Sequence, residues 1–175
     1  MDAAELKTVQ GPLKDTYRND AASALITLRA RGSIDDQAIA CKVETGRALA
    51  IAGLHPATGG SGLELCSGDM LLEALVACAG VTLKAVATAL EFKLDGARLE
   101  AEGDLDFRGT LGVAKDAPVG FRAIRLRIDL DTNEPRERID TLLKLTERYC
   151  VVFQTINTKP ELSVVADAHR PTARM

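Results

Sequence analysis

The sequence predicts an α+β domain in which antiparallel sheets are wrapped around two core helices. Several stretches alternate apolar and polar residues with a period of two, which is typical of strands with one buried face. An apolar run over residues 68–91 and an apolar stripe after Pro135, with spacings of three and four, predict two helices. The expected order is α-βββ-α-ββ-α-β, and no repeat, low-complexity tract or interdomain linker interrupts it.

The N-terminal third predicts a helical segment followed by three strands. Residues 3–21 favour one or two short helices, broken near Gly11 and Pro12. The stretches "SALITLRAR", "QAIACKVE" and "RALAIAG" predict strands, and the turn-like "GSIDD" and "ETG" separate them. Strands joined by such short turns favour an antiparallel meander.

The apolar run over residues 68–91 predicts one long helix, closed by "LDGA". Ser67 can cap its N-terminus, and Asp69 in the first turn is favourable at the positive end of the helix dipole. The helix is apolar nearly all round, which in a soluble protein predicts a buried central helix. It nevertheless carries Glu73 and Cys78, so reactive groups are expected inside the core.

The second half predicts a hairpin, a helix and a closing strand. "RLEAEGDLDF" and "FRAIRLRIDL" both alternate, which favours a long hairpin with one solvated face. A helix is expected to begin near Pro135, a residue preferred in the first turn, with an apolar stripe from Ile139 to Cys150. "ELSVVADAH" then predicts a strand. The expected organisation is a helical segment over 1–22, one domain over 23–169 and a frayed tail over 170–175.

Composition and charge exclude several classes of function. A chain of 175 residues with 46% hydrophobic residues suits one globular domain. The net charge of −3 argues against a nucleic-acid surface. Asp69, Glu73 and Lys84 interrupt the apolar run, which argues against membrane insertion. The N-terminus lacks the basic and apolar segments of a secretory signal. We therefore expect a cytoplasmic protein that binds neither nucleic acid nor membrane.

Two of the four cysteines form a candidate redox pair. In a chain of this kind, thiols are expected to be reduced. Cys78 and Cys150 each lie on the expected buried side of a core helix, so the two thiols can meet if the helices pack together. Adjacent thiols are typical of peroxide-reducing proteins, in which a thiolate attacks the O–O bond, becomes a sulfenic acid and condenses with the second thiol.

The expected burial of Cys78 creates a difficulty for this chemistry. Burial among apolar side chains raises the pKa of a thiol, and the helix dipole fades well before the position of Cys78. We therefore expect a cation from elsewhere in the fold to stabilise the thiolate. Asp69 or Glu73 would orient that cation.

Four segments together resemble the OsmC/Ohr family of osmotically inducible and organic-hydroperoxide-resistance proteins. These are "GDMLLEALVACAGVTLKAVA", "EGDLDFRGTLG", "PVGFRAIRLRIDL" and "LTERYCVVFQT", and the resemblance covers roughly residues 24–166. It implies an intertwined homodimer with active sites at the subunit interface. It also implies that Cys78 is the peroxidatic and Cys150 the resolving cysteine. The implied reaction is reduction of organic hydroperoxides by a dithiol, typically of lipoyl type, without metal or flavin.

The chain departs from the family pattern at the activating groups. Family hydroperoxidases carry a Glu in an Asn-Pro-Glu segment at the start of the central helix, where this chain has "CSGDM" with Asp69 as the nearest acid. They also carry an upstream Arg that pairs with the thiolate. These departures indicate a divergent branch. The candidates here for the cation are Arg29, Arg31, Arg47 and His55.

Structural interpretations of the same residues stay open. Cys78 and Cys150 can be small buried hydrophobes. Cys41 is expected to pack on a strand, and Cys66 either packs before the helix or is an extra redox thiol. Asp69 can be a first-turn acid, His55 a loop residue, and Glu73 an interface or ion-pair residue. No metal site is expected, because two His residues without C-x-x-C or H-x-x-x-H spacing are too few.

Our leading hypothesis is a thiol-dependent peroxidase for organic hydroperoxides, active in oxidative-stress defence without a cofactor. Cys78 would attack and Cys150 would resolve, while Asp69 or Glu73 positions a cation. Aromatic residues make up only 3%, so an aliphatic pocket suited to alkyl hydroperoxides is expected. The alternative is a non-catalytic dimer of the same fold that binds a small apolar or acidic ligand. A third option is a different thiol enzyme, such as an acyl or sulfur transferase, that uses Cys78 and does not need Cys150.

Overall fold

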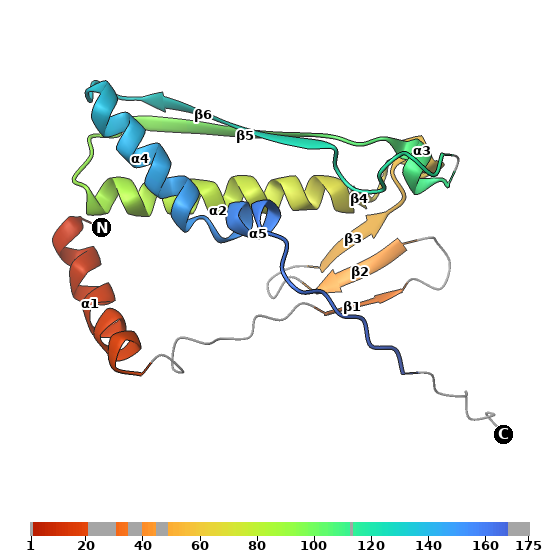
Figure 1. Cartoon of the computed structure of the whole chain (residues 1–175), viewed down its shortest axis with the longest axis horizontal. Helices are drawn as coiled ribbons and strands as arrows, with labels where there is room; N and C mark the ends of the chain where they lie inside the picture. Colours follow the sequence, from red (N-terminus) through yellow and green to blue (C-terminus); the bar gives the residue numbers. More distant parts are fainter. Residues whose placement is uncertain (1, 21–30, 35–39, 45–48, 113, 168–175) are drawn as a thin grey trace.

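A long central helix organises the fold, and the other elements lie around it (Figure 1). The computed structural model describes residues 2–20, 31–34, 40–44, 49–112 and 114–167. Within these ranges the elements are α1 (Ala3–Asn19), β1 (Arg31–Ile34), β2 (Ala40–Glu44), β3 (Leu49–Gly53), η2 (Pro56–Thr58), β4 (Leu65–Cys66), α2 (Ser67–Ala89), β5 (Gly96–Asp104), α3 (Phe107–Thr110), β6 (Ala123–Asp131), α4 (Arg136–Tyr149) and α5 (Val151–Asn157). The α+β prediction is confirmed.

The ends of α2 differ slightly from the expected ones. Cys66, with an extended backbone, is the N-cap and makes no side-chain cap bond, so the prediction of Ser67 as the cap was wrong. The C-terminal end is a Schellman motif. Phe92 donates its N–H to the Ala87 carbonyl at 2.8 Å, and Glu91 donates to Thr88 at 3.1 Å. The helix therefore ends before "LDGA", with Glu91 at a φ of 50°.

Only one face of α2 is buried within the chain. Leu75, Ala79, Leu83 and Ala87 recur every fourth residue, so they form one stripe, and none is more than 2% exposed. Val81, on another face, is 73% exposed. The expectation of a helix buried all round was therefore wrong for the single chain. By length and composition alone α2 could cross a membrane, a test that the core helix of a soluble protein also passes.

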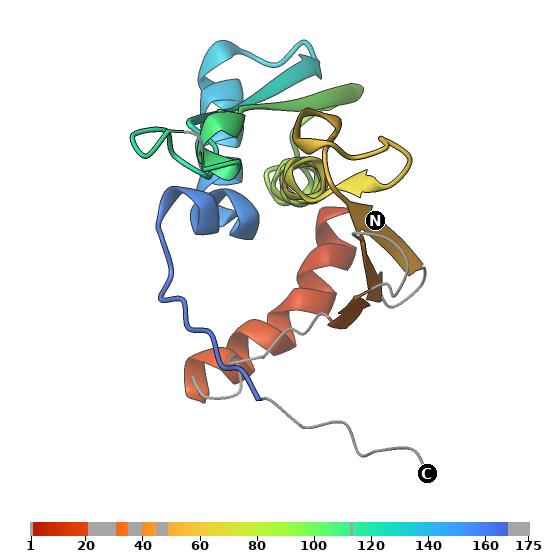
Figure 2. The ribbon, with the colours of Figure 1, turned by 90° about the vertical axis from the view of Figure 1, so that its right-hand side faces the viewer.

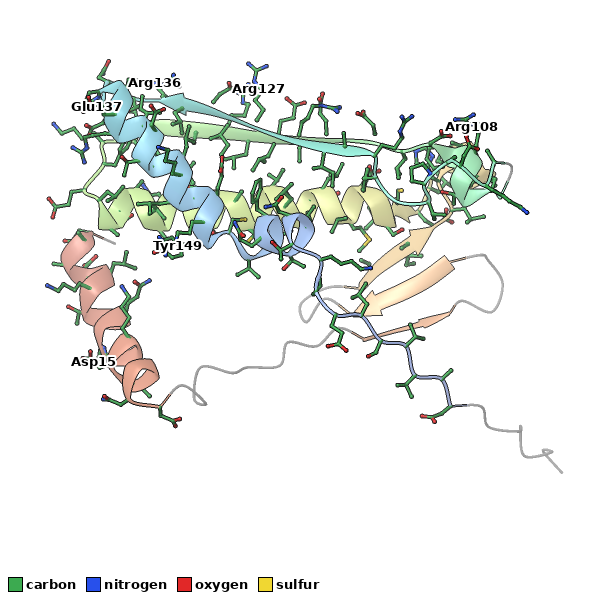
Figure 3. The ribbon with its side chains drawn as sticks, viewed as in Figure 1. Asp15, Arg108, Arg127, Arg136, Glu137 and Tyr149 are labelled. Carbon is green, nitrogen blue, oxygen red and sulfur yellow. The ribbon has the colours of Figure 1, made fainter. Side chains whose placement is uncertain are left out.

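The β5–β6 hairpin covers α2 and has one solvated face, as expected. The strands pair antiparallel from Gly96 opposite Asp131 to Asp104 opposite Ala123. Side chains alternate between partly buried and exposed along both strands. Arg127 stands on the side of the hairpin that faces away from α2 (Figure 3). Viewed along α2, the hairpin, α4 and α5 gather around one side of the helix (Figure 2).

A four-stranded sheet in the order β1-β2-β3-β4 lies at the N-terminal end of α2 (Figure 1). β1, β2 and β3 pair antiparallel, which confirms the predicted meander. Of the first expected strand only Arg31 is among the described residues, and β1 continues through Gly32, Ser33 and Ile34, which were expected to form a turn. β4 pairs parallel with β3, where Gly53 lies opposite Cys66. Because Cys66 also caps α2, this pairing fixes where the central helix begins.

Cys150 lies in a break between two helices. α4 begins directly after Pro135, as predicted, but it ends at Tyr149. Cys150 has a φ of −73° and a ψ of 107°, and it is both the C-cap of α4 and the N-cap of α5. Its side chain is only 1% exposed. The predicted stripe that ends at Cys150 is confirmed, since Leu142, Thr146 and Cys150 are all buried. The break after it was not predicted, and it turns the first amides of α5 toward α2.

The two ends of the chain also differ from expectation. α1 is one helix that runs through Pro12, although an interior proline is unfavourable, and a capping box between Asp2 and Glu5 secures its start. The strand expected over "ELSVVADAH" is absent from the described residues up to 167. Val164 and Val165 there are 95% and 87% exposed, so the segment finds no sheet partner among the described strands of its own chain.

Candidate active site

The two thiols expected to pair are in contact. Cys78 lies on α2 next to the buried stripe, and Cys150 packs against Leu75 and Ala79 of that stripe. α5 lies against the middle of α2 (Figure 1), which holds Cys150 over Cys78. The Cys150 thiol is within hydrogen-bond reach of the Cys78 sulfur, and both are free thiols. Packing of the second helix on the first therefore brings together residues that are far apart in the sequence.

Four neutral donors surround the Cys78 sulfur. Two are the backbone N–H groups of Val151 and Val152, in the first turn of α5. The first N–H groups of a helix have no intrahelical acceptor, so they are free to donate elsewhere. The other two donors are the Cys150 thiol and the hydroxyl of Thr82, one turn further along α2. Protein groups therefore supply hydrogen bonds to this sulfur that water would otherwise supply.

These donors lower the pKa of Cys78 despite its partial burial. Burial is the largest single influence and raises the pKa of the thiol. The hydrogen bonds from Val152, Cys150, Val151 and Thr82 together outweigh it, so the pKa of Cys78 lies below its ordinary value. Burial was expected to keep the Cys78 thiol protonated unless a cation lay nearby. Neutral hydrogen-bond donors lower its pKa, and sequence reasoning did not predict them.

The pKa of Cys150 is displaced in the opposite direction. Burial raises it most, the N–H groups of Phe153 and Val152 act against this, and the neighbouring Cys78 raises it further. Two titratable groups whose surroundings drive their pKa values apart take different chemical roles. Within this pair the Cys78 thiol has the lowered pKa and the Cys150 thiol the raised one, and Cys150 donates a hydrogen bond to the Cys78 sulfur.

A mostly apolar pocket of about 200 Å³ adjoins the pair. It lies between α2, β6, α4 and α5. Its lining consists of Ala79, Leu126, Ile128, Leu143, Thr146, Glu147, Cys150 and Phe153. Aliphatic side chains dominate this lining, and Glu147 is its single acid.

Asp69 and Glu73 lie on other faces of α2 than Cys78. Asp69 is nine positions before Cys78 and Glu73 five, so at 3.6 residues per turn they point roughly 180° and 140° away from the thiol around the helix. Both are exposed. Asp69 lines a separate pocket with His55 and Cys66. The described part of the chain therefore does not bring either acid to the thiol, and their role in orienting a cation stays a prediction.

His55 has a structural role at the end of the fold away from the thiol pair. Its Nδ1 accepts the Ala57 N–H at 3.0 Å, which caps η2, and its ring stacks on Phe107 with the ring centroids 4.8 Å apart. The two thiols and His55 thus belong to different sites.

Arg29 and Arg47 lie outside the described residues, and so do the side chains of Arg31 and Cys41. Among the described residues, no group of three His, Cys, Asp or Glu side chains could hold a metal ion.

Sequence reasoning missed three of the groups that contact the Cys78 sulfur. Thr82 had a usable signal, because residues four apart on a helix are neighbours. The amides of Val151 and Val152 had none, since nothing in "YCVVFQ" indicates a helix break at Cys150.

Comparisons with known proteins agree with this architecture. The family model described as OsmC-like protein matches residues 60–165. No curated protein matches the chain at a significant level. Among solved structures, an OsmC-like protein from Mycoplasma pneumoniae is similar with a TM-score of 0.64 at 13% identity, over 77% of this chain and 89% of that chain.

Two further structures belong to named hydroperoxide-resistance proteins. The organic hydroperoxide resistance protein OsmC from Legionella pneumophila gives a TM-score of 0.59 at 16% identity, over 77% of this chain and 91% of that chain. The organic hydroperoxide resistance protein OhrB of Bacillus subtilis gives 0.53 at 17% identity, over 77% and 93%. At such identities these likenesses establish the fold, while the family model spans more than half of the sequence. The chain belongs to the OsmC-like protein family.

Proposed function

We propose that the protein reduces organic hydroperoxides through Cys78 and Cys150. Membership of the OsmC-like family and the similarity to proteins named for organic hydroperoxide resistance support a hydroperoxide-related role. The observation that carries the finer proposal is the contact between a thiol of lowered pKa and a second thiol of raised pKa. Such a pair supplies a nucleophile, a proton and a second sulfur at one place.

The proposed reaction uses all three. The Cys78 thiolate attacks the terminal oxygen of ROOH, the O–O bond breaks, and Cys78 becomes a sulfenic acid while RO⁻ leaves. The proton of Cys150 converts RO⁻ to ROH. The resulting Cys150 thiolate attacks the Cys78 sulfur, hydroxide leaves, and an S–S bond forms. An external dithiol then reduces this disulfide and is itself oxidised to a disulfide.

The apolar pocket beside Cys150 supports alkyl hydroperoxides as the substrate class. Its aliphatic lining offers few partners to a small polar peroxide, whereas it suits a hydrocarbon chain. We therefore propose that substrates with an alkyl or aryl group react faster than hydrogen peroxide.

We also propose that the active form is a cytoplasmic homodimer. The exposed apolar residues of α2, among them Val81 and Leu71, support a second copy as their cover. Arg29 would then add a positive charge to the neutral donors around the thiolate. Because Asp69 and Glu73 point away from Cys78 of their own chain, any part they take at a thiol would be at that of the second copy.

Turnover of cumene hydroperoxide with dithiothreitol tests the proposal. The wild type and Cys66→Ser, whose thiol lies at the far end of α2, are expected to consume the hydroperoxide, and Cys78→Ser is not. Mass spectrometry of the wild type after one equivalent of hydroperoxide is expected to give a 78–150 disulfide. Equal consumption by wild type and Cys78→Ser would refute the peroxidase. Unchanged thiols would favour the alternative, a non-catalytic protein that binds a small apolar or acidic ligand.

A further inference from the structure

The apolar pocket beside the thiol pair has a carboxylate in its lining. Among the described residues that line it, Glu147 carries the one carboxylate, and none is a lysine or an arginine. Apart from the Cys150 thiol, the remaining polar side chain is that of Thr146, whose hydroxyl already donates to the Leu142 carbonyl at 2.8 Å. A molecule that enters the pocket therefore meets hydrocarbon and one negative charge.

The position of Glu147 on α4 places it at the rim of this pocket. Leu143, Thr146 and Glu147 all belong to the lining. At 3.6 residues per turn they lie within an arc of about 100° around the helix, so they share one face. Thr146 is buried, whereas Glu147 is exposed. Thr146 is therefore part of the inner wall, and Glu147 lies where the pocket meets solvent.

The backbone of Glu147 is tied to α5. The side-chain amide of Gln154 donates to the Glu147 carbonyl at 2.8 Å. This bond joins α4 and α5 across the break at Cys150. The point from which the carboxylate extends is therefore held in place relative to Cys150, which lines the same pocket.

No cation pairs with the Glu147 carboxylate in the part of the chain that the structure describes. The ion pairs on α4 involve other residues. Lys144 and Arg148 are the nearest basic residues along the helix, and neither lines the pocket. The Arg148 guanidinium instead lies over the ring of Tyr149, 5.4 Å from its centroid. The carboxylate at the pocket rim therefore keeps its charge uncompensated.

We propose that Glu147 is a specificity residue, which selects neutral and cationic hydroperoxides against anionic ones of the same size. The proposal rests on the proposed function, because it names the substrate class of that reaction. The pocket, at about 200 Å³, is smaller than the roughly 300–1,000 Å³ typical of small-molecule sites, so a charged group on a bound substrate lies near the rim. Glu147 takes no part in breaking the O–O bond, so the selection is expected in KM more than in kcat.

The expected effect is modest because water screens a charge at the rim. Repulsion between two partly screened unit charges is expected to lower kcat/KM for an anionic substrate by about fivefold relative to its neutral analogue. Glu147→Gln should raise this anionic-to-neutral ratio about fivefold, and Glu147→Lys should raise it about fivefold further. High salt should raise the ratio in the wild type and leave it unchanged in Glu147→Gln.

The experiment compares cumene hydroperoxide with its para-carboxylate, with dithiothreitol as the reductant. Glu137→Gln is the matched control, because it also removes one negative charge from an exposed position on α4. Glu137 lies in the first turn of the helix and outside the pocket, so this variant should keep the wild-type ratio. Glu147→Asp retains the charge and should keep the wild-type preference for the neutral substrate.

A second measurement needs no hydroperoxide. Iodoacetamide and iodoacetate are similar in size, but only iodoacetate is anionic, and both alkylate thiolates. The ratio of their rates, followed by the masses of the Cys78 and Cys150 peptides, therefore cancels any change in thiolate fraction. Glu147→Gln should increase the relative rate of iodoacetate about fivefold, and Glu137→Gln should not.

Three outcomes would overturn the proposal. These are ratios in Glu147→Gln that equal those of the wild type, a shift of equal size in Glu137→Gln, and a Glu147→Lys variant that still disfavours the anionic reagents as the wild type does. Circular dichroism checks that each variant is folded. A wild type that consumes no hydroperoxide would refute the proposed function, while the two alkylating reagents would still measure the charge that Glu147 places at the pocket.

Discussion

Replacing Val151 by proline isolates the contribution of one backbone amide to the ionisation of Cys78. Val151 is the first residue of α5 and its N–H donates to the Cys78 sulfur. Proline lacks this donor but is favoured at the first position of a helix. The extended backbone of Cys150, with φ −73° and ψ 107°, is of the kind that a following proline requires. Because Val151 is 68% exposed, little apolar burial is lost.

The size of the effect follows from the surroundings of the sulfur. A hydrogen bond to a charged group contributes about 1.5–3 kcal/mol when the group is buried. Cys78 is only partly buried, so we take about half of the middle of this range, about 1 kcal/mol, which corresponds to roughly 0.7 of a pKa unit. The donor stabilises the thiolate, and its loss therefore raises the pKa of Cys78. The same substitution leaves the N–H of Val152 in place.

The thiolate absorbance near 240 nm, followed against pH, measures this shift. Val151→Ala is the matched control, since it removes the side chain but keeps the N–H, and its pKa for Cys78 should equal that of the wild type. If Val151→Pro folds normally and titrates like the wild type, then the Val151 amide does not stabilise the Cys78 thiolate.

Two further predictions concern the stability and assembly of α2. Glu91→Gly is expected to stabilise the protein by about 0.5–1 kcal/mol, because Glu91 has a φ of 50° that suits glycine. Thermal unfolding should show a rise of a few degrees, and Glu91→Ala, which keeps a Cβ, should show none; equal melting temperatures for both would contradict this. Val81→Lys puts a charge on the exposed apolar face of α2 and is expected to convert the proposed homodimer to monomers, as measured by analytical ultracentrifugation. Val119→Lys is the control, because Val119 is similarly exposed but lies in a loop, and this variant should stay dimeric. A dimer that persists in Val81→Lys would exclude this face as the interface.

Local patterns identified most of the elements because their causes are local. The alternation in "RLEAEGDLDF" and "FRAIRLRIDL" matches a hairpin whose inner residues cover α2. The same kind of reasoning failed at "ELSVVADAH", whose alternation also suits a strand, because a strand needs a partner edge that local sequence does not supply. At Pro12 the helix continues although proline is unfavourable in a helix interior, so one breaker residue did not define a boundary.

The candidate site was predicted in part. Cys78 and Cys150 are in contact, as the spacing of apolar residues on two helices led us to expect. Asp69 and His55 were grouped with Cys78 because their chemistry suits a thiolate, yet they line a different pocket. Residue type indicates what a side chain can do, but the helical turn decides which way it points.

The sequence by itself determined the fold class, the helix that carries Cys78 and the second cysteine able to reach it, because these depend on hydrophobic periodicity. Only the tertiary structure decided which groups lower the pKa of the Cys78 thiol. The break at Cys150 directs the amides of Val151 and Val152 across to a sulfur on another helix, and hydrogen bonds between elements have no signature in either element alone. The physical reason is that periodicity is a property of one segment, whereas solvation of a charge depends on every segment packed around it.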